Sequence, residues 1–362
     1  MATFDAYAIS QHFALPSPVA EIKPFGNGLI NNTFRIRCED GSLFTMQRIN
    51  TTVFKNPVAL TENIVGVCSF IKEKVAREGG DVMREVVCPV PNHDGTYYYQ
   101  SEQDGFWRVQ HFIDGARGYD SAEREGLLYE AAFAFGQFQR RLDDYPAATL
   151  HETIQNFHHT ESRYRAFEEA IALDVAGRAD SVRAELDALI LRKSFASAIT
   201  SRLADGTLPV RVTHNDTKLN NVLIDDVTGK GICVIDLDTV MPGSLLYDFG
   251  DGVRFACNNT LEDDRDLSRV WLDLSRYEEF ASGFLCGMGD AITAEEKALL
   301  PLSAFILTYE SALRFMTDYL NGDVYFKINA PDHNLVRTRN QIKLMEDILS
   351  KLDEMAAIGN KY

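Results

Sequence analysis

The pattern of apolar and polar residues along the 362-residue chain changes at Asp114-Gly115, and no other sequence feature constrains its fold as much. Before this point, short runs of alternating apolar and polar residues predict β-strands, and Asp-Gly pairs between them predict hairpin turns. Apolar residues at helical spacing over 58–78, ended by Gly79-Gly80, predict one helix among the strands. The expected strands lie at residues 19–25, 33–39, 42–50, 96–100 and 106–113.

Beyond Gly115 the spacing of apolar residues is mainly helical. We therefore predict an α+β fold in two parts: residues 1–115, a small antiparallel sheet with one helix, and residues 116–362, mainly helical. The expected helical stretches lie at 121–142, 160–204, 265–288, 293–320 and 335–357. Short apolar runs expected to be strands lie between them at 208–214, 221–225 and 232–238.

The composition of the chain argues against several kinds of binding partner and bound group. The chain has 36 Lys and Arg against 53 Asp and Glu, a net charge of −17, which argues against nucleic acid or an anionic membrane as the main partner. The six cysteines form no CxxC pair, so a structural zinc site is not expected, and Cys68 and Cys233 lie in apolar runs typical of buried thiols. The chain shows no signal-peptide pattern at its start and no membrane-spanning stretch, so we expect a reduced, cytoplasmic protein.

Polar residues gather between two of the apolar runs. His214, Asp216 and Asn221 lie in one loop, and Asp236 ends the very apolar stretch ICVI. Carboxylate and amide oxygens in such an arrangement can hold Mg²⁺, and a further carboxylate can orient and deprotonate an acceptor hydroxyl. Phosphoryl transfer needs little else from a protein. The competing interpretation is a plain loop in which Asp and Asn side chains only cap the backbone.

The spacing His-x-Asp-x-x-x-x-Asn, followed 15 residues later by Asp236, resembles a kinase catalytic loop. Over nearly its whole length the chain resembles the aminoglycoside phosphotransferase/choline kinase group, which has the protein-kinase-like two-lobe fold. Within that group, the stretches 211–221, 235–251 and 333–344 are most similar to bacterial N-acetylhexosamine 1-kinases. The resemblance implies ATP and Mg²⁺ as cofactors, a nucleotide-binding lobe over 1–115 and a catalytic and substrate lobe over 116–362.

The same resemblance implies roles for the loop residues. Asp216 is expected to accept the proton of the acceptor hydroxyl, and Asn221 and Asp236 are expected to bind Mg²⁺. These three residues are the core of the expected active site.

Three further residues are expected to support this core. His214, counted with the catalytic residues, would hold the catalytic loop through hydrogen bonds, and a packing role is at least as well supported for it as direct participation in the chemistry. Lys218 would neutralise phosphate charge, unless it is an ordinary exposed lysine. Asp248, in YDFGD, would brace the loop rather than take part in the chemistry.

The nucleotide is expected to bind at a glycine turn and at the hinge between the lobes. Backbone amides approach phosphates closely only where side chains are absent, although a plain turn has the same GxG pattern. The hinge would offer backbone groups to the adenine. The expected contacts are Gly26, Asn27 and Gly28 in the turn and Gln110, His111 and Phe112 at the hinge.

The third expected strand departs from the kinase pattern. This strand usually supplies a lysine for the α- and β-phosphates, whereas here we place Gln47 at that position, as in the hexosamine kinases, with Arg48 beside it. Neighbouring strand residues point to opposite faces, so Arg48 cannot replace the lysine. Phosphate charge is thus left to Mg²⁺, to backbone amides, or to another base that the sequence does not identify.

The acceptor side rests on the resemblance, which implies Arg314 and Tyr325 as sugar contacts and Phe255 as an apolar wall. Arg314 could instead pair with Glu310 one helical turn before it, and the two aromatic residues could belong to the core. The hexosamine kinases carry a histidine after the second loop glycine, whereas this chain has Leu29, so the sugar preference could differ.

The resemblance implies ATP-dependent phosphorylation of the anomeric C1 hydroxyl of N-acetylglucosamine or N-acetylgalactosamine. The same chemistry on another hexose, an amino alcohol or an aminoglycoside is the alternative, since amine substrates call for an acidic pocket and the chain has an acidic surplus. An inactive kinase fold used as a binding module is favoured by Gln47 and disfavoured by the intact Asp216, Asn221 and Asp236. No APE-type segment follows IDLD, which disfavours a protein kinase.

Overall fold

The computed structural model describes residues 4–26, 30–122 and 124–362. Contacts between these residues divide the chain into two compact units. The first unit comprises Met1–Gly118, Asp144–Gln155 and Asn221–Pro242, and the second comprises Tyr119–Asp143, Asn156–Asn220 and Gly243–Tyr362. The functional division at residue 115, into a nucleotide-binding lobe and a catalytic lobe, stays a prediction.

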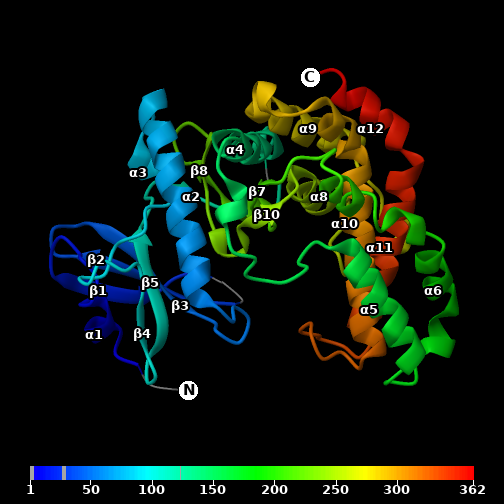
Figure 1. Ribbon diagram of the computed structural model, residues 1–362, viewed down its shortest axis with the longest axis horizontal. Coiled ribbons are helices and arrows are strands. Elements are labelled where there is room, and N and C mark those ends of the chain that lie inside the picture. The colour runs from blue at the N-terminus through cyan, green and yellow to red at the C-terminus, as the bar shows by residue number, and fades with distance from the viewer. Residues whose placement is uncertain (1–3, 27–29, 123) are drawn as a thin grey trace. The chain divides into compact units, whose positions relative to one another are not determined.

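The first unit contains the expected antiparallel sheet, whose five strands have the order β1-β2-β3-β5-β4 (Figure 1). Hairpin turns with left-handed glycines join neighbouring strands, with φ of +87° at Gly41 and +86° at Gly105, as the Asp-Gly pairs predict. The strands are β1 (Val19–Pro24), β2 (Asn32–Cys38), β3 (Leu43–Ile49), β4 (Tyr99–Ser101) and β5 (Gly105–His111).

The helix expected over 58–78 is α2 (Pro57–Glu78). It begins where the Asn56 side chain accepts the Ala59 N–H and ends at Gly79 in the left-handed conformation, so both ends follow local sequence signals. Two short helices, α1 (Ala6–Ser10) and α3 (Val82–Glu85), belong to the same unit. A buried cluster with Trp107 and Phe44 at its centre joins one face of the sheet to α1.

A second sheet of the first unit has three strands in the order β6-β8-β9. They are β6 (Ala116–Arg117), β8 (Val222–Asp225) and β9 (Gly231–Val234), followed by the short 3-10 helix η5 (Leu237–Thr239) and by β10 (Met241–Gly243). Ala116 pairs with Asp225, and Arg84 forms an ion pair with the same aspartate. These contacts explain why residues 221–242 belong to the first unit, although they follow Gly115 by more than a hundred positions.

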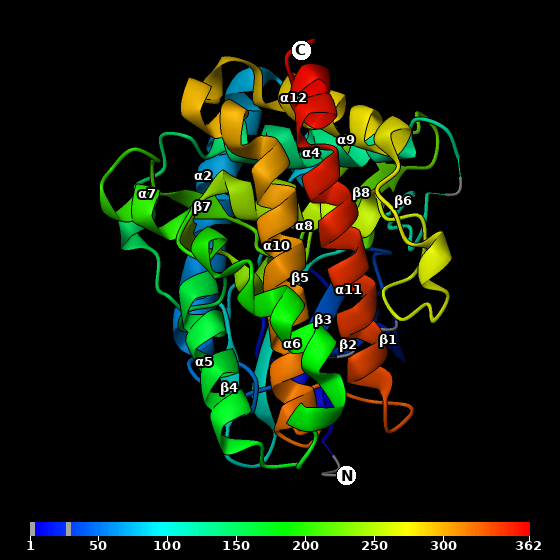
Figure 2. The same ribbon diagram turned by 90° about the vertical axis from the view of Figure 1, so that its right-hand side faces the viewer.

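The second unit is mainly helical, and its long helices α10 and α11 lie side by side (Figure 2). Its one described strand is β7 (Arg211–Thr213). The helices are α4 (Leu127–Arg141), α5 (Thr160–Leu173), α6 (Arg183–Ile190), α7 (Thr200–Ala204), α8 (Leu245–Ala256), α9 (Leu274–Met288), α10 (Ala294–Leu320), α11 (His333–Ser350) and α12 (Leu352–Gly359).

The stretch expected to be helical over 160–204 is broken. Helix α5 ends at Leu173, because Asp174 adopts the left-handed conformation with φ +36°, and Gly177 follows with φ +65°. Short 3-10 turns, η2 (Ala179–Val182) and η3 (Lys193–Phe195), separate the later helical pieces.

Helix α8 was not expected, because Gly250 and Gly252 lower its helix propensity. Both glycines have a packing reason. A Cβ at Gly250 would lie 2.5 Å from the Ser303 carbonyl oxygen, and one at Gly252 would lie 2.4 Å from the Phe280 ring. Tertiary packing therefore requires glycine where local propensity argues against a helix.

Glycines also set the close approach of α4 and α9. A Cβ at Gly283 would lie 2.3 Å from the Tyr129 carbonyl oxygen, and one at Gly287 would lie 2.3 Å from that of Phe133. The two helix backbones are thus in direct contact, which side chains larger than glycine would prevent.

Two expectations from composition, on the cysteines and on membrane-spanning segments, can be compared with the structure. Cys68 and Cys233 are buried free thiols, as their apolar neighbours predict. None of the helices in the described parts of the chain combines the length and the apolar character that crossing a bilayer demands.

Candidate active site

The loop after β7 buries the residues on either side of Asp216. His214, Asn215 and Thr217 are at most 5% exposed, whereas the Asp216 side chain keeps 26% of its surface exposed. Asn215 adopts a left-handed φ of +64°, an unusual conformation for a residue with a side chain. The backbone conformation and the burial of its neighbours together present the Asp216 carboxylate at the surface of the second unit.

Asp248, on α8, holds this loop in place. Its carboxylate accepts the backbone N–H groups of His214 at 2.9 Å and Asn215 at 2.7 Å. The Gln139 side chain donates to the same carboxylate at 2.6 Å, and the Thr217 hydroxyl donates to the Asp248 carbonyl at 2.6 Å. Burial raises the pKa of Asp248, although His214 and these donors oppose the shift.

His214 combines packing with one local hydrogen bond. Its ring packs edge-on against Phe135 and Phe138, with centroid distances of 5.5 and 6.0 Å. Its Nδ1 accepts the Asp216 N–H at 3.3 Å. His214 therefore both packs against α4 and forms a hydrogen bond with the loop backbone.

Lys218 forms an ion pair with Asp216, the two side chains being 2.6 Å apart. Burial alone would lower the pKa of Lys218, but the carboxylates of Asp216 and Asp251 outweigh it and raise the pKa above its ordinary value. Lys218 therefore places a positive charge next to the candidate base, with 41% of its side chain exposed, and its role toward phosphate stays a prediction.

Phe255 lies beneath cationic groups rather than in the core. Its ring is 37% exposed, with the Arg254 guanidinium 3.9 Å and the Lys218 ammonium 5.5 Å from its centroid. Arg254 is in turn paired with Asp251 at 2.9 Å. Phe255 therefore helps to place the Lys218 charge, and one of its faces already contacts cations.

Asn221 and Asp236 lie next to each other in the first unit. Val222 pairs with Val234 across β8 and β9, and the Ile235 N–H donates to the Asn221 carbonyl at 2.9 Å. Asp236 follows with a left-handed φ of +61° and is exposed, between the half-buried Ile235 and the buried Leu237. The strand pairing thus brings the two expected metal ligands to one edge of this sheet.

The donor set at this edge fits Mg²⁺. An amide oxygen and a carboxylate are hard oxygen ligands, and Mg²⁺ usually takes one or two protein ligands together with water and substrate phosphates. Within residues 4–26, 30–122 and 124–362, no three His, Cys, Asp or Glu side chains are grouped so as to hold a metal ion. Asn221 and Asp236 would hold Mg²⁺ in this way, with water and substrate phosphates as its other ligands.

The expected glycine turn is flanked by contacts to the hinge and to η5. Gly26 has a left-handed φ of +74°, and Asn27, Gly28 and Leu29 lie outside the described residues. Just before the turn, Phe25 packs on Phe112 with ring centroids 5.3 Å apart. Just after it, the Asn31 side chain donates to Asp238 at 2.6 Å. These contacts place the two ends of the turn beside the hinge and the metal-ligand loop.

Two hinge N–H groups are already engaged. The His111 N–H donates to the Cys88 carbonyl at 2.9 Å, and the Phe112 N–H donates to the Leu43 carbonyl at 3.0 Å. The adenine contact at Gln110, His111 and Phe112 stays a prediction, and it would have to use groups other than these two donors.

Gln47 lies opposite a buried arginine that the sequence did not single out. Thr33, Gln47 and Arg108 face one another across β2, β3 and β5. The Gln47 side-chain oxygen accepts from Arg108 Nε at 2.9 Å and Nη2 at 2.7 Å. Arg108 Nη1 and Asp238 Oδ1 are 2.5 Å apart, as an ion pair without the alignment of a regular hydrogen bond. The cation beside the missing lysine position is therefore Arg108.

The other candidates for a charge partner lie elsewhere. The Arg48 guanidinium lies over the Phe4 ring at 5.4 Å, on the opposite face from Gln47, as strand alternation predicts. Glu62, on α2, pairs with His151 at 2.9 Å and is exposed. Neither residue takes the place of the lysine that is missing at position 47.

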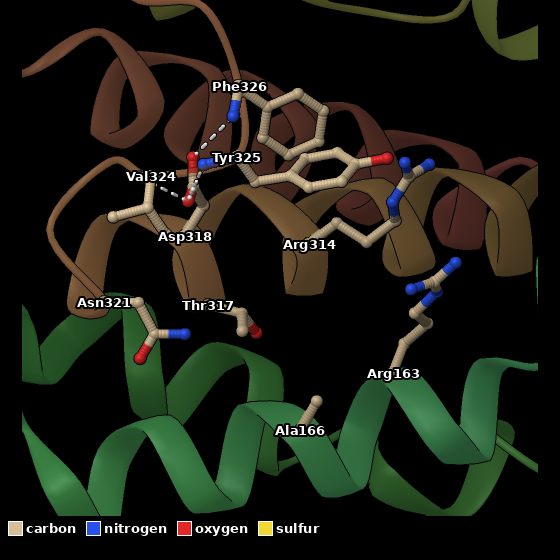
Figure 3. Close-up of a pocket in the computed structure, with 9 residues that line it drawn as sticks. All are labelled: Arg163, Ala166, Arg314, Thr317, Asp318, Asn321, Val324, Tyr325 and Phe326. Carbon is tan, nitrogen blue, oxygen red and sulfur yellow. Dashed lines mark hydrogen bonds between the residues drawn. The ribbon is translucent and has the colours of Figure 1, made fainter. Parts of the chain in front are cut away.

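A pocket of about 220 Å³ lies between α5, α10 and the segment after α10 in the second unit (Figure 3). Arg163 and Arg314 stand at one end of it, and the Tyr325 ring extends toward the Arg314 guanidinium. Burial and the neighbouring charge of Arg314 lower the pKa of Arg163. The lining includes Arg163, Arg314, Thr317, Asn321, Tyr325 and Phe326.

The pocket's own acid, Asp318, is engaged by three backbone N–H groups and by the Asn334 side chain, which donates at 2.8 Å. The Asp318 carboxylate accepts the N–H groups of Val324, Tyr325 and Phe326 at 2.8–2.9 Å, as the dashed lines in Figure 3 mark. Tyr325 itself is 72% exposed and therefore does not belong to the core. Asp318 shapes the segment that presents Tyr325.

Glu310 binds His158 and Thr160, so it is not the simple partner of Arg314. Its two carboxylate oxygens contact His158 Nδ1 and the Thr160 hydroxyl, each at 2.8 Å. His158 Nε2 is 3.3 Å from the Asn215 carbonyl oxygen. A chain of contacts therefore runs from α10, which carries Arg314, to the residue before Asp216. No local sequence signal marks His158 or Arg163, which only the folded chain brings to the site.

The structure thus gathers the expected site residues into two groups, one in each unit. The first holds Gly26, Gln47, Gln110, His111, Phe112, Asn221 and Asp236, and the second holds His214, Asp216, Lys218, Asp248, Phe255, Arg314 and Tyr325.

Three solved structures with related folds come from small-molecule kinases and their relatives. The chain is similar to an aminoglycoside phosphotransferase from Alicyclobacillus acidocaldarius, with 12% identity, a TM-score of 0.60, and coverage of 100% of this chain and 98% of that one. It is similar to amicoumacin kinase in complex with AMP-PNP, Ca²⁺ and Ami, with 15% identity, a TM-score of 0.53, and coverage of 99% and 94%. It is also similar to a choline/ethanolamine kinase family protein from Mesorhizobium loti, with 16% identity, a TM-score of 0.52, and coverage of 98% of both chains.

At these identities the likeness concerns the fold, and it confirms the expected α+β, protein-kinase-like class. The family relationship rests on sequence. The family described as "Phosphotransferase enzyme family" matches residues 21–280, well over half of the chain. The chain therefore belongs to the phosphotransferase enzyme family.

Proposed function

We propose that this protein transfers the γ-phosphoryl group of ATP to a hydroxyl of a small molecule, with the anomeric C1 hydroxyl of an N-acetylhexosamine as the acceptor. The observation that carries this proposal is the Asp216 carboxylate, exposed on a loop that Asp248 fixes and placed 2.6 Å from the Lys218 ammonium. A carboxylate held in this way can take the proton of an acceptor hydroxyl, and the lysine can offset phosphate charge.

The residues divide the remaining tasks. Asp248 braces the loop, and His214 supports it by packing and by accepting the Asp216 N–H. Mg²⁺, when held by Asn221 and Asp236, would supply the charge neutralisation that phosphoryl transfer needs. The glycine turn and the hinge would hold the nucleotide, in keeping with the AMP-PNP bound to the similar amicoumacin kinase.

The pocket favours a neutral, hydroxyl-rich acceptor over an amine. Arg163 and Arg314 put two positive charges at its end, and the oxygens of the lining acid Asp318 already accept from three backbone N–H groups and from the Asn334 side chain. A cationic amino group would meet repulsion from the two arginines, and the Asp318 oxygens are already engaged as acceptors. Arginine donors and the Tyr325 ring suit the hydroxyl and carbonyl oxygens and the apolar face of a sugar.

The test is an acceptor panel with purified protein. ADP release would be measured with N-acetylglucosamine, N-acetylgalactosamine, glucose, galactose, choline, ethanolamine and an aminoglycoside, and the phosphate position would be assigned by NMR. We expect turnover with the N-acetylhexosamines and a sugar 1-phosphate as product. Turnover confined to the amines would overturn the acceptor assignment, and nucleotide binding without turnover on any acceptor would favour a binding module.

Asp216→Asn tests the base. The substitution keeps the side-chain shape, so nucleotide binding should persist while turnover falls by about 10²-fold or more. Asp180→Asn is the matched control, because Asp180 is also an aspartate of the second unit paired with a cation, Arg183 at 2.8 Å, but lies outside the site. Near-normal turnover in the Asp216 variant would exclude this residue as the base.

A further inference from the structure

A row of polar residues, half-buried at Thr33 and Gln47 and buried at Arg108, crosses the main sheet where a lysine is missing. Thr33 accepts from the Gln47 amide at 3.2 Å, and the Gln47 oxygen accepts two N–H groups of Arg108. Arg108 is 7% exposed, and its Nη1 faces Asp238. The row therefore ends on an acid that belongs to η5, two positions after the candidate metal ligand Asp236.

Asp238 also reaches the glycine turn. Its second carboxylate oxygen accepts the Asn31 side-chain N–H at 2.6 Å, and the Asn31 oxygen accepts the Asn50 N–H at 2.9 Å. Asp238 is 4% exposed, and all of these residues belong to the first unit. One buried carboxylate thus joins the sheet, the end of the glycine turn and the loop that carries Asp236.

We propose that Asp238 is a positioning residue for the bound MgATP, which it serves by fixing Asn31 and the Asp236 loop to the sheet through Arg108. The role rests on the proposed function. Asp236 needs this support because its left-handed backbone conformation, with φ +61°, is disfavoured for a residue with a side chain. A buried carboxylate that accepts a hydrogen bond from an amide and forms an ion pair with a guanidinium restrains such a loop strongly.

Arg108 acts in this network as the counter-charge of Asp238 rather than as a phosphate ligand. Its Nε and one N–H of Nη2 bind Gln47, and Nη1 faces the acid. With its charge balanced by Asp238 and its side chain buried, it adds little net positive potential for an anionic nucleotide. The cation that replaces the missing lysine thus holds the site together instead of binding the phosphates.

Exchanging the donor and the acceptor between positions 31 and 238 tests the link. Asn31→Asp alone sets two carboxylates against each other, and Asp238→Asn alone removes the charge that balances Arg108. The double variant Asn31→Asp/Asp238→Asn keeps one acid and one amide at the contact and leaves the total charge unchanged. Asn92→Ala serves as the control, since Asn92 is a part-buried asparagine of the same unit whose side chain donates to the Tyr98 carbonyl, away from the Asp238 contacts.

The readouts are the dissociation constant of MgATP by calorimetry, the Mg²⁺ concentration at half-saturation, and the midpoint of thermal unfolding. Each single variant should weaken MgATP binding by about tenfold or more, the size expected for the loss of one charge-assisted hydrogen bond. The double variant should regain most of that loss, which a purely additive effect of two damaged positions would not do. The control should bind MgATP as the unaltered protein does.

Three results would overturn the inference in distinguishable ways. Single variants that fold and bind MgATP with unaltered affinity and Mg²⁺ dependence would exclude a positioning role for Asp238 while leaving the proposed function intact. A double variant no better than the sum of the single ones would exclude the direct Asn31–Asp238 link. An unaltered protein that binds no MgATP would refute the proposed function, and the positioning role with it.

Discussion

Gln47→Lys restores the residue that kinases usually carry on this strand, and we expect it to damage this protein. The Gln47 oxygen accepts two N–H groups of Arg108, at 2.7 and 2.9 Å. A lysine at this position removes the acceptor and brings a second positive charge next to a guanidinium that is 7% exposed. The family's usual residue is therefore incompatible with the arginine already present.

The cost can be worked out in two steps with Gln47→Met as the reference. Methionine has a similar length and removes only the acceptor, which should lower the free energy of unfolding by about 2 kcal/mol, the value of one hydrogen bond to a charged group. Lysine adds repulsion of about 4 kcal/mol for charges roughly 4 Å apart at an effective dielectric constant near 20. Attraction to Asp238 cancels part of that repulsion, so we expect the lysine variant to be about 1–2 kcal/mol less stable than the methionine variant.

Urea unfolding of the three proteins measures these differences, and calorimetry with MgATP measures the consequence for the nucleotide. We expect both variants to lose stability in the order given and neither to bind MgATP more tightly than the unaltered protein. A lysine variant that is as stable as the methionine variant and binds MgATP more tightly would refute the reasoning. In that case Arg108 would not occupy the space next to position 47.

The other predictions concern packing, pH and metal. Gly283→Ala should lower the free energy of unfolding by about 3 kcal/mol, because its Cβ would lie 2.3 Å from the Tyr129 carbonyl oxygen. Gly359→Ala, with nothing within 4 Å of its Cβ, should be neutral or stabilising. Urea unfolding measures both variants, and equal effects on stability would contradict the packing argument. Burial alone would raise the pKa of Glu310, but His158 and nearby cations outweigh burial and lower this pKa. The stability that the Glu310 charge contributes is therefore present above the unfolded pKa and is lost as pH falls through the folded pKa, which lies below 4.5. The stability difference between the unaltered protein and Glu310→Gln, measured at pH 7 and in steps below pH 4.5, should therefore shrink toward acid, and a difference that grows would reverse the assignment. Chelation of Mg²⁺ should abolish measurable ATP binding, since Arg108 is committed to Asp238, and calorimetry that finds equal affinity with EDTA would count against the metal's role.

Local signals predicted the elements that have clear ends. The hairpins follow from Asp-Gly pairs with left-handed glycines, and α2 follows from Asn56 at one end and Gly79 at the other. The missed helix α8 shows the limit, because Gly250 and Gly252 argue against a helix locally. Only the contacts of those glycines with α10 and α9 explain their presence.

The same division applies to the site. The spacing of His214, Asp216 and Asn221 is contained in one short stretch, so the sequence could place the candidate base and a metal ligand without knowledge of the fold. Asp238 lies two residues after Asp236 in IDLD, and Arg108 lies between apolar residues in FWRVQHF. Neither position carries a local sequence signal of its role. The pairing of Arg108 with Gln47 depends on the register of β3 with β5, which a hairpin pattern alone does not define, and its pairing with Asp238 depends on a segment 130 positions later in the chain.

The sequence by itself predicted the chemistry, because the carboxylates and the amide expected to serve phosphoryl transfer lie at short spacings along the chain. Tertiary structure decided which charges face one another. It set Arg108 between Gln47 and Asp238, and it brought His158 and Arg163 to a site whose other members lie far away in the chain. The physical reason is that a motif is a local pattern of residue types, whereas the balance of a buried charge depends on every segment packed around it.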